Sequence, residues 1–106
     1  MRDGDGCPMC AKGGPADTGF GVRFLAGRVS NAYLQRAAIQ PGYTIVIWSG
    51  PHVAEPTELS EVDAAAYGAD VLDAGRAIEA HFQPVKMNYQ TLGNSLPHLH
   101  THVIPR

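Results

Sequence analysis

The sequence predicts a single α+β domain, an antiparallel sheet of about five strands with one long helix, in the order β-β-β-α-β-β. Three observations support this class. Strand-like runs dominate the first half of the chain, one long segment has helical periodicity, and two more strand-like runs follow it. The chain has 106 residues, a usual length for one domain, so we expect 1–106 to form a single domain.

The first half predicts a loop followed by three strands. Residues 1–19 are rich in Gly and Pro and carry no regular pattern, which favours a loop. Short runs at 21–27 and 29–36 predict two strands joined by a tight connection at Gly27 and Arg28. The run at 43–48 is almost wholly apolar and β-branched, which predicts a buried central strand.

One helix is predicted to begin near Ser60 and to end before Pro84. Ser60 is a suitable N-cap, and Glu61 and Asp63 place negative charge in the first turn, where the helix dipole favours it. Two adjoining stripes at helical spacing form the expected buried face. The first stripe comprises Val62, Ala66, Ala69, Leu72, Gly75 or Arg76, and Ala80; the second comprises Val71, Ala74, Ile78 and Phe82.

The chain after the helix predicts two further strands. Residues 85–91 alternate as a strand, 92–95 read as a turn, and 97–104 predict the last strand. The order of elements therefore completes an antiparallel sheet with a helix on one face.

Composition and charge exclude several function classes. Hydrophobic residues make up 44% of the chain and charged residues 17%, which is typical of a globular protein. The formal net charge of −2 provides no basic field to attract nucleic acid or an anionic membrane. No apolar run approaches the ~20 residues that span a bilayer, and the first residues do not resemble a secretory signal. We therefore expect a soluble cytoplasmic protein.

Cys7 and Cys10 form the motif Cys-Pro-Met-Cys, and the chain has 2 cysteines in all. In a reducing compartment such a pair serves as half of a metal site or as a redox dithiol. A redox motif normally joins a strand to a helix, whereas this pair lies in a Gly-rich loop. The metal interpretation is the better one, although two thiolates fill half of a tetrahedral zinc site.

The sequence His-Leu-His-Thr-His places His98, His100 and His102 at alternate positions of the last predicted strand. Side chains two apart on a strand share a face, so these imidazoles would form a row. The outer two would lie about 13 Å apart, too far to bind one ion from a straight strand. A row that binds and attacks a phosphate fits this spacing better, because neutral imidazole is a nucleophile near pH 7.

Other polar residues fall near the row. Gly93, Asn94 and Ser95 place a turn, an amide and a hydroxyl just before it, groups that can donate to phosphoryl oxygens. His52 follows the central strand, and is either a structural residue or a metal ligand. His81, near the end of the helix, is explained by the helix dipole.

The segment 93–106 resembles the signature of the histidine triad (HIT) nucleotide hydrolases and transferases, His-φ-His-φ-His-φ-φ, where φ is apolar. A related motif precedes the row in that family, usually Gly-Gln-Ser, and here it is Gly-Asn-Ser. Two further segments support the likeness. The run 41–47 followed by His52 resembles the family's Gly-His-Thr-Leu-Val-Ile-Pro-Lys-x-His, and Cys7 and Cys10 match the Cys-x-x-Cys of many bacterial members.

The resemblance implies roles for individual residues. His100 would be the nucleophile that attacks the α-phosphorus and forms a nucleotidyl-histidine intermediate. The residues implied for phosphate binding are Asn88, Asn94, Ser95 and His102. A structural zinc ion would be held by Cys7, Cys10, His52 and His98, with residues 1–19 as its loop region. Candidate residues for the nucleoside groove are Phe24, Leu25 and Ile45.

The same resemblance implies a function, and several positions differ from the family motif. It implies a homodimer that hydrolyses or transfers a nucleotide from a nucleoside phosphoramidate or a dinucleoside polyphosphate. Tyr43 replaces the usual histidine of Gly-His, Trp48 and Ser49 stand where Pro-Lys is common, and Thr101 is a polar φ residue. Because the sequence ends four residues after His102, we expect it to lack the usual C-terminal tail. Two alternatives remain, a nucleotide-binding protein with weak turnover and a zinc metalloenzyme that uses the histidine row as ligands.

Overall fold

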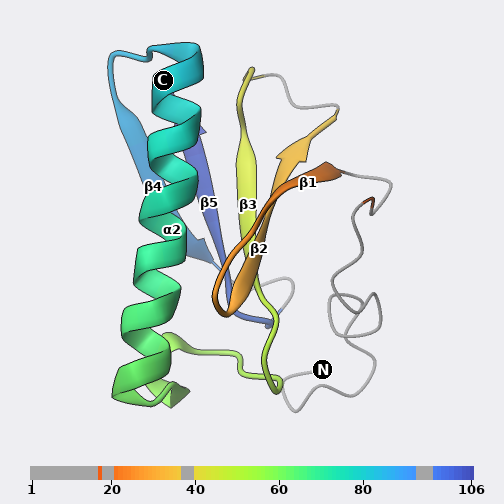
Figure 1. The fold of residues 1–106 in the computed structure, drawn as a ribbon, viewed down its shortest axis with the longest axis vertical. Coiled ribbons are helices and arrows are strands. Elements are labelled where there is room, and N and C mark those ends of the chain that lie inside the picture. Colours follow the sequence, from red (N-terminus) through yellow and green to blue (C-terminus); the bar gives the residue numbers. More distant parts are fainter. Residues whose placement is uncertain (1–16, 18–20, 37–39, 93–96) are drawn as a thin grey trace.

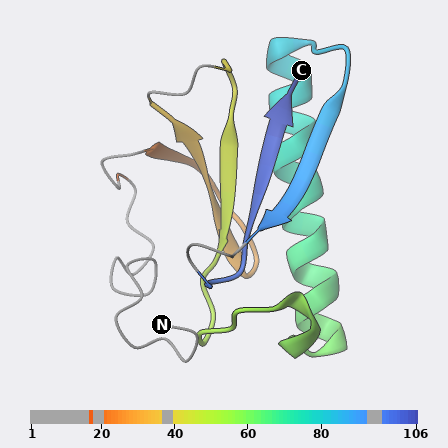
Figure 2. The same ribbon diagram turned by 180° about the vertical axis from the view of Figure 1, so that it is seen from behind.

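A computed structural model describes residues 17, 21–36, 40–92 and 97–106. In these residues one antiparallel sheet carries a single long helix along one face (Figures 1 and 2). The strand order is β1-β2-β3-β5-β4, so the last strand lies between the third and the fourth. The elements in chain order are β1 Gly21–Ala26, β2 Ser30–Gln35, β3 Thr44–Trp48, the 3₁₀ turn η1 Pro56–Glu58, α2 Glu61–Phe82, β4 Met87–Leu92 and β5 His100–Pro105. The predicted α+β class and element order are confirmed.

The boundaries of the last two strands differ from the prediction. β4 begins at Met87, and before it the backbone N–H of Val85 donates to the carbonyl of Arg106 outside the regular pairing. β5 begins at His100 because Leu99 donates its N–H to Val53, in the segment that follows β3. His98 therefore lies before the strand, and the predicted straight row of three histidines on one strand is wrong for its first member.

Helix α2 begins and ends where its caps predict. The hydroxyl of Ser60 accepts a hydrogen bond from the backbone N–H of Asp63, 3.1 Å away. Gln83 closes the helix in the left-handed conformation at φ 48°, directly before Pro84.

The second of the two predicted apolar stripes forms the main buried face of α2, and Gly75 of the first stripe is buried as well. The second stripe packs on the core through Val71, Ala74, Ile78 and Phe82. Val62 and Leu72 of the first stripe are exposed, so that part of the prediction is wrong. The buried face turns instead toward Tyr67 and Asp70, whose polar atoms the periodicity of apolar residues does not register.

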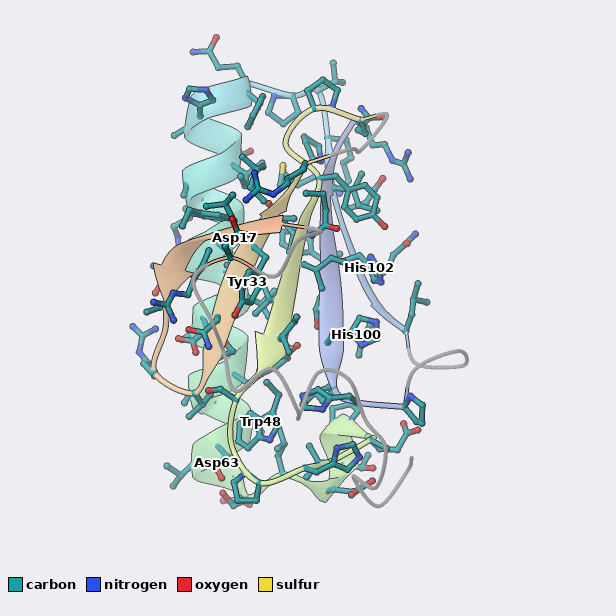
Figure 3. All side chains as sticks on the ribbon, turned by 90° about the vertical axis from the view of Figure 1, so that its right-hand side faces the viewer. Asp17, Tyr33, Trp48, Asp63, His100 and His102 are labelled. Atoms are coloured by element: carbon teal, nitrogen blue, oxygen red, sulfur yellow. The ribbon has the colours of Figure 1, made fainter. Side chains whose placement is uncertain are left out.

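Alternation along β5 assigns the two faces of the sheet. Thr101 and Val103 are buried toward α2, and the hydroxyl of Thr101 lies 2.8 Å from that of Tyr67 on the helix. His100 and His102 consequently project from the opposite face, on the side of β5 away from α2 (Figure 3). We call this second surface the histidine face.

The carboxylate of Asp70 joins α2 to the β1–β2 turn. It accepts hydrogen bonds from the backbone N–H groups of Arg28 and Val29, from the Ser30 hydroxyl and from the Arg28 guanidinium, all at 2.8–3.0 Å. A Cβ on Gly27 would lie 2.5 Å from the Asp70 carboxyl carbon, so the turn needs glycine there to approach so closely. The Asp70 carboxylate thus accepts hydrogen bonds that water would otherwise accept from this turn.

Gly42 fixes the chain where it enters β3. Its φ is +85°, and a Cβ there would lie 2.8 Å from the Phe82 ring and 2.9 Å from the Pro105 ring. Both the backbone conformation and the space therefore exclude a side chain. This constraint places Tyr43, the next residue, at the start of the strand.

Loss of the Asp70 carboxylate is expected to destabilise the fold strongly. Asp70→Ala should lower the free energy of unfolding by about 3–5 kcal/mol, because buried donors of the turn lose their acceptor. Asp73→Ala is the matched control: Asp73 also pairs with Arg28 but is partly exposed, so its loss should cost under about 1 kcal/mol. Urea denaturation measures both, and equal losses would contradict the assignment.

The difference in stability between wild type and Asp70→Ala should depend on pH. Burial by itself raises the pKa of Asp70, but the hydrogen bonds from Val29, Arg28 and Ser30 together lower it. Because the folded pKa is the lower one, the stabilisation is complete above the unfolded pKa of about 3.9 and is lost as the pH falls below it. The stability gap between wild type and Asp70→Ala should therefore narrow below about pH 4.

Two glycines should respond oppositely to alanine. Gly42→Ala should destabilise the protein by about 1–3 kcal/mol through its positive φ and its contacts with Phe82 and Pro105. Gly68→Ala, inside α2 with no atom within 4 Å of the added Cβ, should stabilise it by about 0.5–1 kcal/mol. Thermal unfolding of both variants tests this, and a neutral Gly42→Ala would show that the turn tolerates a side chain.

Candidate active site

His100 is held in one orientation by the backbone beside it. Its Nδ1 lies 2.6 Å from the carbonyl oxygen of His98. Since a carbonyl can only accept, Nδ1 carries the hydrogen, and in the neutral ring the lone pair is on Nε2. The side chain is 6% exposed, so this orientation is fixed by packing as well. His100 therefore offers an imidazole whose nucleophilic nitrogen is defined.

His102 lies next along the histidine face, with its ring centroid 5.1 Å from that of His100. Its Nδ1 is 2.7 Å from the hydroxyl oxygen of Tyr43. Burial lowers the pKa of His102, and the neighbouring His100 lowers it further. This environment favours a neutral ring at pH 7.

His98 and His52 meet at the end of the sheet next to His100. Their ring centroids are 5.1 Å apart, and the Nε2 of His52 is buried. The Nε2 of His98 lies 2.8 Å from the carbonyl of Trp48, so it carries the hydrogen and leaves Nδ1 with the lone pair. Burial lowers the pKa of His98, and the nearby His52 and His100 lower it further, against the effect of the hydrogen bond to Trp48.

The strand register identifies four neighbours of the histidines, of which sequence reasoning had named Ile45 alone. On β4, Gln90 is paired with His102 and Leu92 with His100. Directly opposed residues of antiparallel strands share a face, so both belong to the histidine face. On β3, Ile45 is paired with His102 and Ile47 with His100. Alternation within 87–92 could have indicated Gln90, but its partner on β5 depends on the pairing.

Asn88 is not brought to His100. It is paired with Ile104, about 13 Å along the sheet from the pair formed by Leu92 and His100. Its side-chain oxygen accepts a hydrogen bond from Nε of Arg106 at 2.9 Å. Gln90, which is paired with His102, is the amide that the register brings nearest to the histidine pair on β4.

The groove residues divide between the two faces. Ile45 lies on the histidine face as expected, and Phe24 occupies the irregular position in the pairing of β1 with β2, 40% exposed. Leu25 packs against the core on the helix side, so its place in a groove is wrong.

Four predicted residues lie outside the described part of the chain: Cys7, Cys10, Asn94 and Ser95. Within the described residues, no group of three or more His, Cys, Asp or Glu side chains could hold a metal ion. The structure therefore leaves these phosphate-binding and zinc assignments as predictions.

A comparison with known protein families identifies the domain. The HIT domain matches residues 24–106, which is most of the chain. The chain belongs to the HIT domain family. A comparison with curated proteins gave no match.

Solved HIT proteins have the same fold. One from Bacillus subtilis is 25% identical with a TM-score of 0.80, over 95% of this chain and 73% of that protein. One from Bacillus anthracis is 25% identical with a TM-score of 0.80, over 96% and 74%. A histidine triad protein from Bradyrhizobium japonicum is 25% identical with a TM-score of 0.75, over 82% of this chain. The match spans 64% of the length of that last protein.

The family as a whole has a general function. HIT proteins are generally nucleotide hydrolases or transferases and bind nucleotide substrates. In the described part of this HIT domain, no helix is long and apolar enough to span a membrane.

Proposed function

We propose that this HIT domain cleaves a nucleoside phosphoramidate or a dinucleoside polyphosphate at the α-phosphate, with His100 as the nucleophile. The observation that carries the proposal is the hydrogen bond from Nδ1 of His100 to the carbonyl of His98, 2.6 Å long. It leaves the lone pair on Nε2, the nitrogen that can attack phosphorus.

The chemistry takes two steps. In the first, Nε2 of His100 forms a bond to the α-phosphorus while the bond to the leaving group breaks, and the leaving group takes up a proton from solvent. In the second, water attacks the nucleotidyl-histidine and returns a proton to solvent, the nitrogen–phosphorus bond breaks, and a nucleoside monophosphate is released. The carbonyl of His98 stabilises the imidazole as it gains positive charge, because its oxygen faces Nδ1–H.

The histidine face provides groups for the rest of the substrate. His102 can donate a hydrogen bond to a phosphoryl oxygen, and Asn94 and Ser95 are the proposed partners from the segment before β5. Gln90 adds an amide beside His102. Ile45 and Ile47 offer apolar surface beside the two histidines, suited to the nucleoside.

We propose a structural zinc ion held by Cys7, Cys10, His52 and His98. The two described members fit this role: their rings are adjacent, and the hydrogen bond from Nε2 of His98 to Trp48 orients Nδ1 as a ligand atom. The lowered pKa of His98 keeps it neutral, as a metal ligand must be. When bound, zinc would supply a cross-link between the segment 1–19 and the sheet.

A homodimer is also proposed. β4 is an edge of the sheet in the described chain, and it presents Leu92, which is 51% exposed. Val85, just before it, is 99% exposed. An exposed strand edge with apolar side chains is a surface on which a second copy of the chain can pair.

His100→Ala should abolish turnover. With adenosine phosphoramidate as substrate, release of AMP should fall at least about a thousandfold, since the attacking nitrogen is gone. His81→Ala is the matched control, because His81 is exposed near the end of α2, and it should keep wild-type turnover. Wild-type turnover by His100→Ala would remove His100 from its role. If wild type releases no AMP but binds the nucleotide in calorimetry, the protein is a nucleotide-binding protein.

Removal of a zinc ligand should lower the stability of the fold rather than act directly on turnover. Cys7→Ser and His52→Ala should each lose the bound zinc measured by metal analysis and lower the melting temperature, whereas His81→Ala should retain both. Undiminished zinc in Cys7→Ser would exclude Cys7 as a ligand. Treatment with a chelator should lower the melting temperature while turnover persists below it. Immediate loss of turnover in the folded protein would instead indicate a catalytic zinc.

A further inference from the structure

The hydroxyl of Tyr43 contacts the histidine face, and the reaction proposed above assigns it no task. It lies 2.7 Å from Nδ1 of His102. The two rings meet edge to face, with centroids 5.6 Å apart and planes at 85°. The tyrosine is therefore directed at one particular nitrogen of one histidine of the site.

The backbone holds Tyr43 firmly in this position. Its carbonyl accepts a hydrogen bond from the N–H of Gln35 at 2.9 Å, which extends the pairing of β2 with β3. Its own N–H donates to the carbonyl of Gln40 at 3.2 Å. The preceding Gly42 fits against the rings of Phe82 and Pro105 with no space for a side chain. Tyr43 is thus anchored independently of His102.

The chemistry of the two groups decides which one donates. A neutral imidazole has one N–H donor and one acceptor nitrogen, and a phenol donates more readily than it accepts. Burial and the neighbouring His100 both favour the neutral form of His102. The hydroxyl of Tyr43 therefore donates to Nδ1, and the single hydrogen of the His102 ring is on Nε2.

We propose that Tyr43 is a positioning residue that holds His102 as the neutral Nε2–H tautomer, so that His102 presents a hydrogen-bond donor to the phosphoryl oxygens. The phosphate part of this inference rests on the proposed function, whereas the tautomer does not. The two neighbouring histidines then carry opposite tautomers. His100 donates from Nδ1 to a carbonyl and attacks with Nε2, and His102 accepts at Nδ1 and donates from Nε2.

The residue type matters for this task. The segment containing Tyr43 resembles a family motif in which histidine usually stands at this position. An imidazole there could carry one hydrogen or two and could donate or accept from either nitrogen, whereas a phenol has a single O–H donor. Tyr43 thus supplies one defined donor to His102.

Nitrogen NMR of the full chain labelled at histidine tests the tautomer directly. At pH 7.5, His102 of the wild type should show a protonated Nε2 and a hydrogen-bonded, unprotonated Nδ1, with a single tautomer populated. In Tyr43→Phe, which removes the hydroxyl and keeps the ring, the Nδ1 signal should move and the other tautomer should appear. Tyr89→Phe is the matched control, because Tyr89 is paired with Val103 and so lies on the helix side of the sheet. It should leave the His102 signals unchanged.

Kinetics provide a second readout. Tyr43→Phe should lower kcat about five- to tenfold with little change in KM, as expected for loss of one hydrogen bond whose effect is felt in the transition state. Tyr89→Phe should retain the wild-type kcat. An unchanged kcat in Tyr43→Phe would overturn the contribution of Tyr43 to the phosphate site.

The two readouts separate this inference from the proposed function. If the wild type has no turnover but the NMR signals of His102 change in Tyr43→Phe as expected, the proposed function fails and the tautomer assignment stands. A protonated Nδ1 in the wild type, or His102 signals in Tyr43→Phe identical to those of the wild type, would overturn the inference even in an active enzyme. Because the wild-type spectrum alone can overturn it, a poorly folded variant would not protect the proposal.

Discussion

The alternation of side chains along β5 is the constraint on which the site depends. β5 lies between β3 and β4, and its residues from His100 to Val103 are paired on both sides, so the strand cannot shift by one position without exchanging its two faces. Such a shift would carry His100 and His102 into the packing under α2 and expose Val103. Val103 is fully buried, so the shift would cost the free energy that its burial contributes. The chemistry and the core are thus specified by the same six-residue strand.

Three histidines close in sequence acquire different properties from three different neighbours. The nitrogen of His98 that carries a hydrogen is set by the carbonyl of Trp48, that of His100 by the carbonyl of His98, and that of His102 by the hydroxyl of Tyr43. None of these contacts requires a charged partner. Because the donors and acceptors are already oriented in the folded chain, little reorganisation is needed when charge develops on a substrate. The three histidines of the row therefore have different chemical properties and are not interchangeable.

The sequence predicted the element order and the positions of His100 and His102, because strand alternation and helix caps are local properties that depend on few residues. The buried face of α2 was predicted only in part. A carboxylate in a helix normally indicates a position exposed to solvent, whereas Asp70 is buried and forms hydrogen bonds to a turn about 40 residues earlier. Gln90 and Tyr43 were missed as neighbours of His102 because their nearness depends on the pairing of β4 and of β3 with β5. Long-range register is the information that local patterns lack.

Thr101 shows how the helix side supports the chemistry on the other side. It stands between His100 and His102 where an apolar residue is usual, and its hydroxyl lies within 2.9 Å of the hydroxyls of both Tyr67 and Thr91. Burial raises the pKa of Tyr67 to about 12, so its hydroxyl stays neutral as a partner for Thr101. A buried hydroxyl is costly unless it is paired, and α2 and β4 supply both partners only in the observed register. The polar exception in the motif therefore acts against the one-residue slip that would destroy the histidine face, which gives a structural reason for threonine at this position.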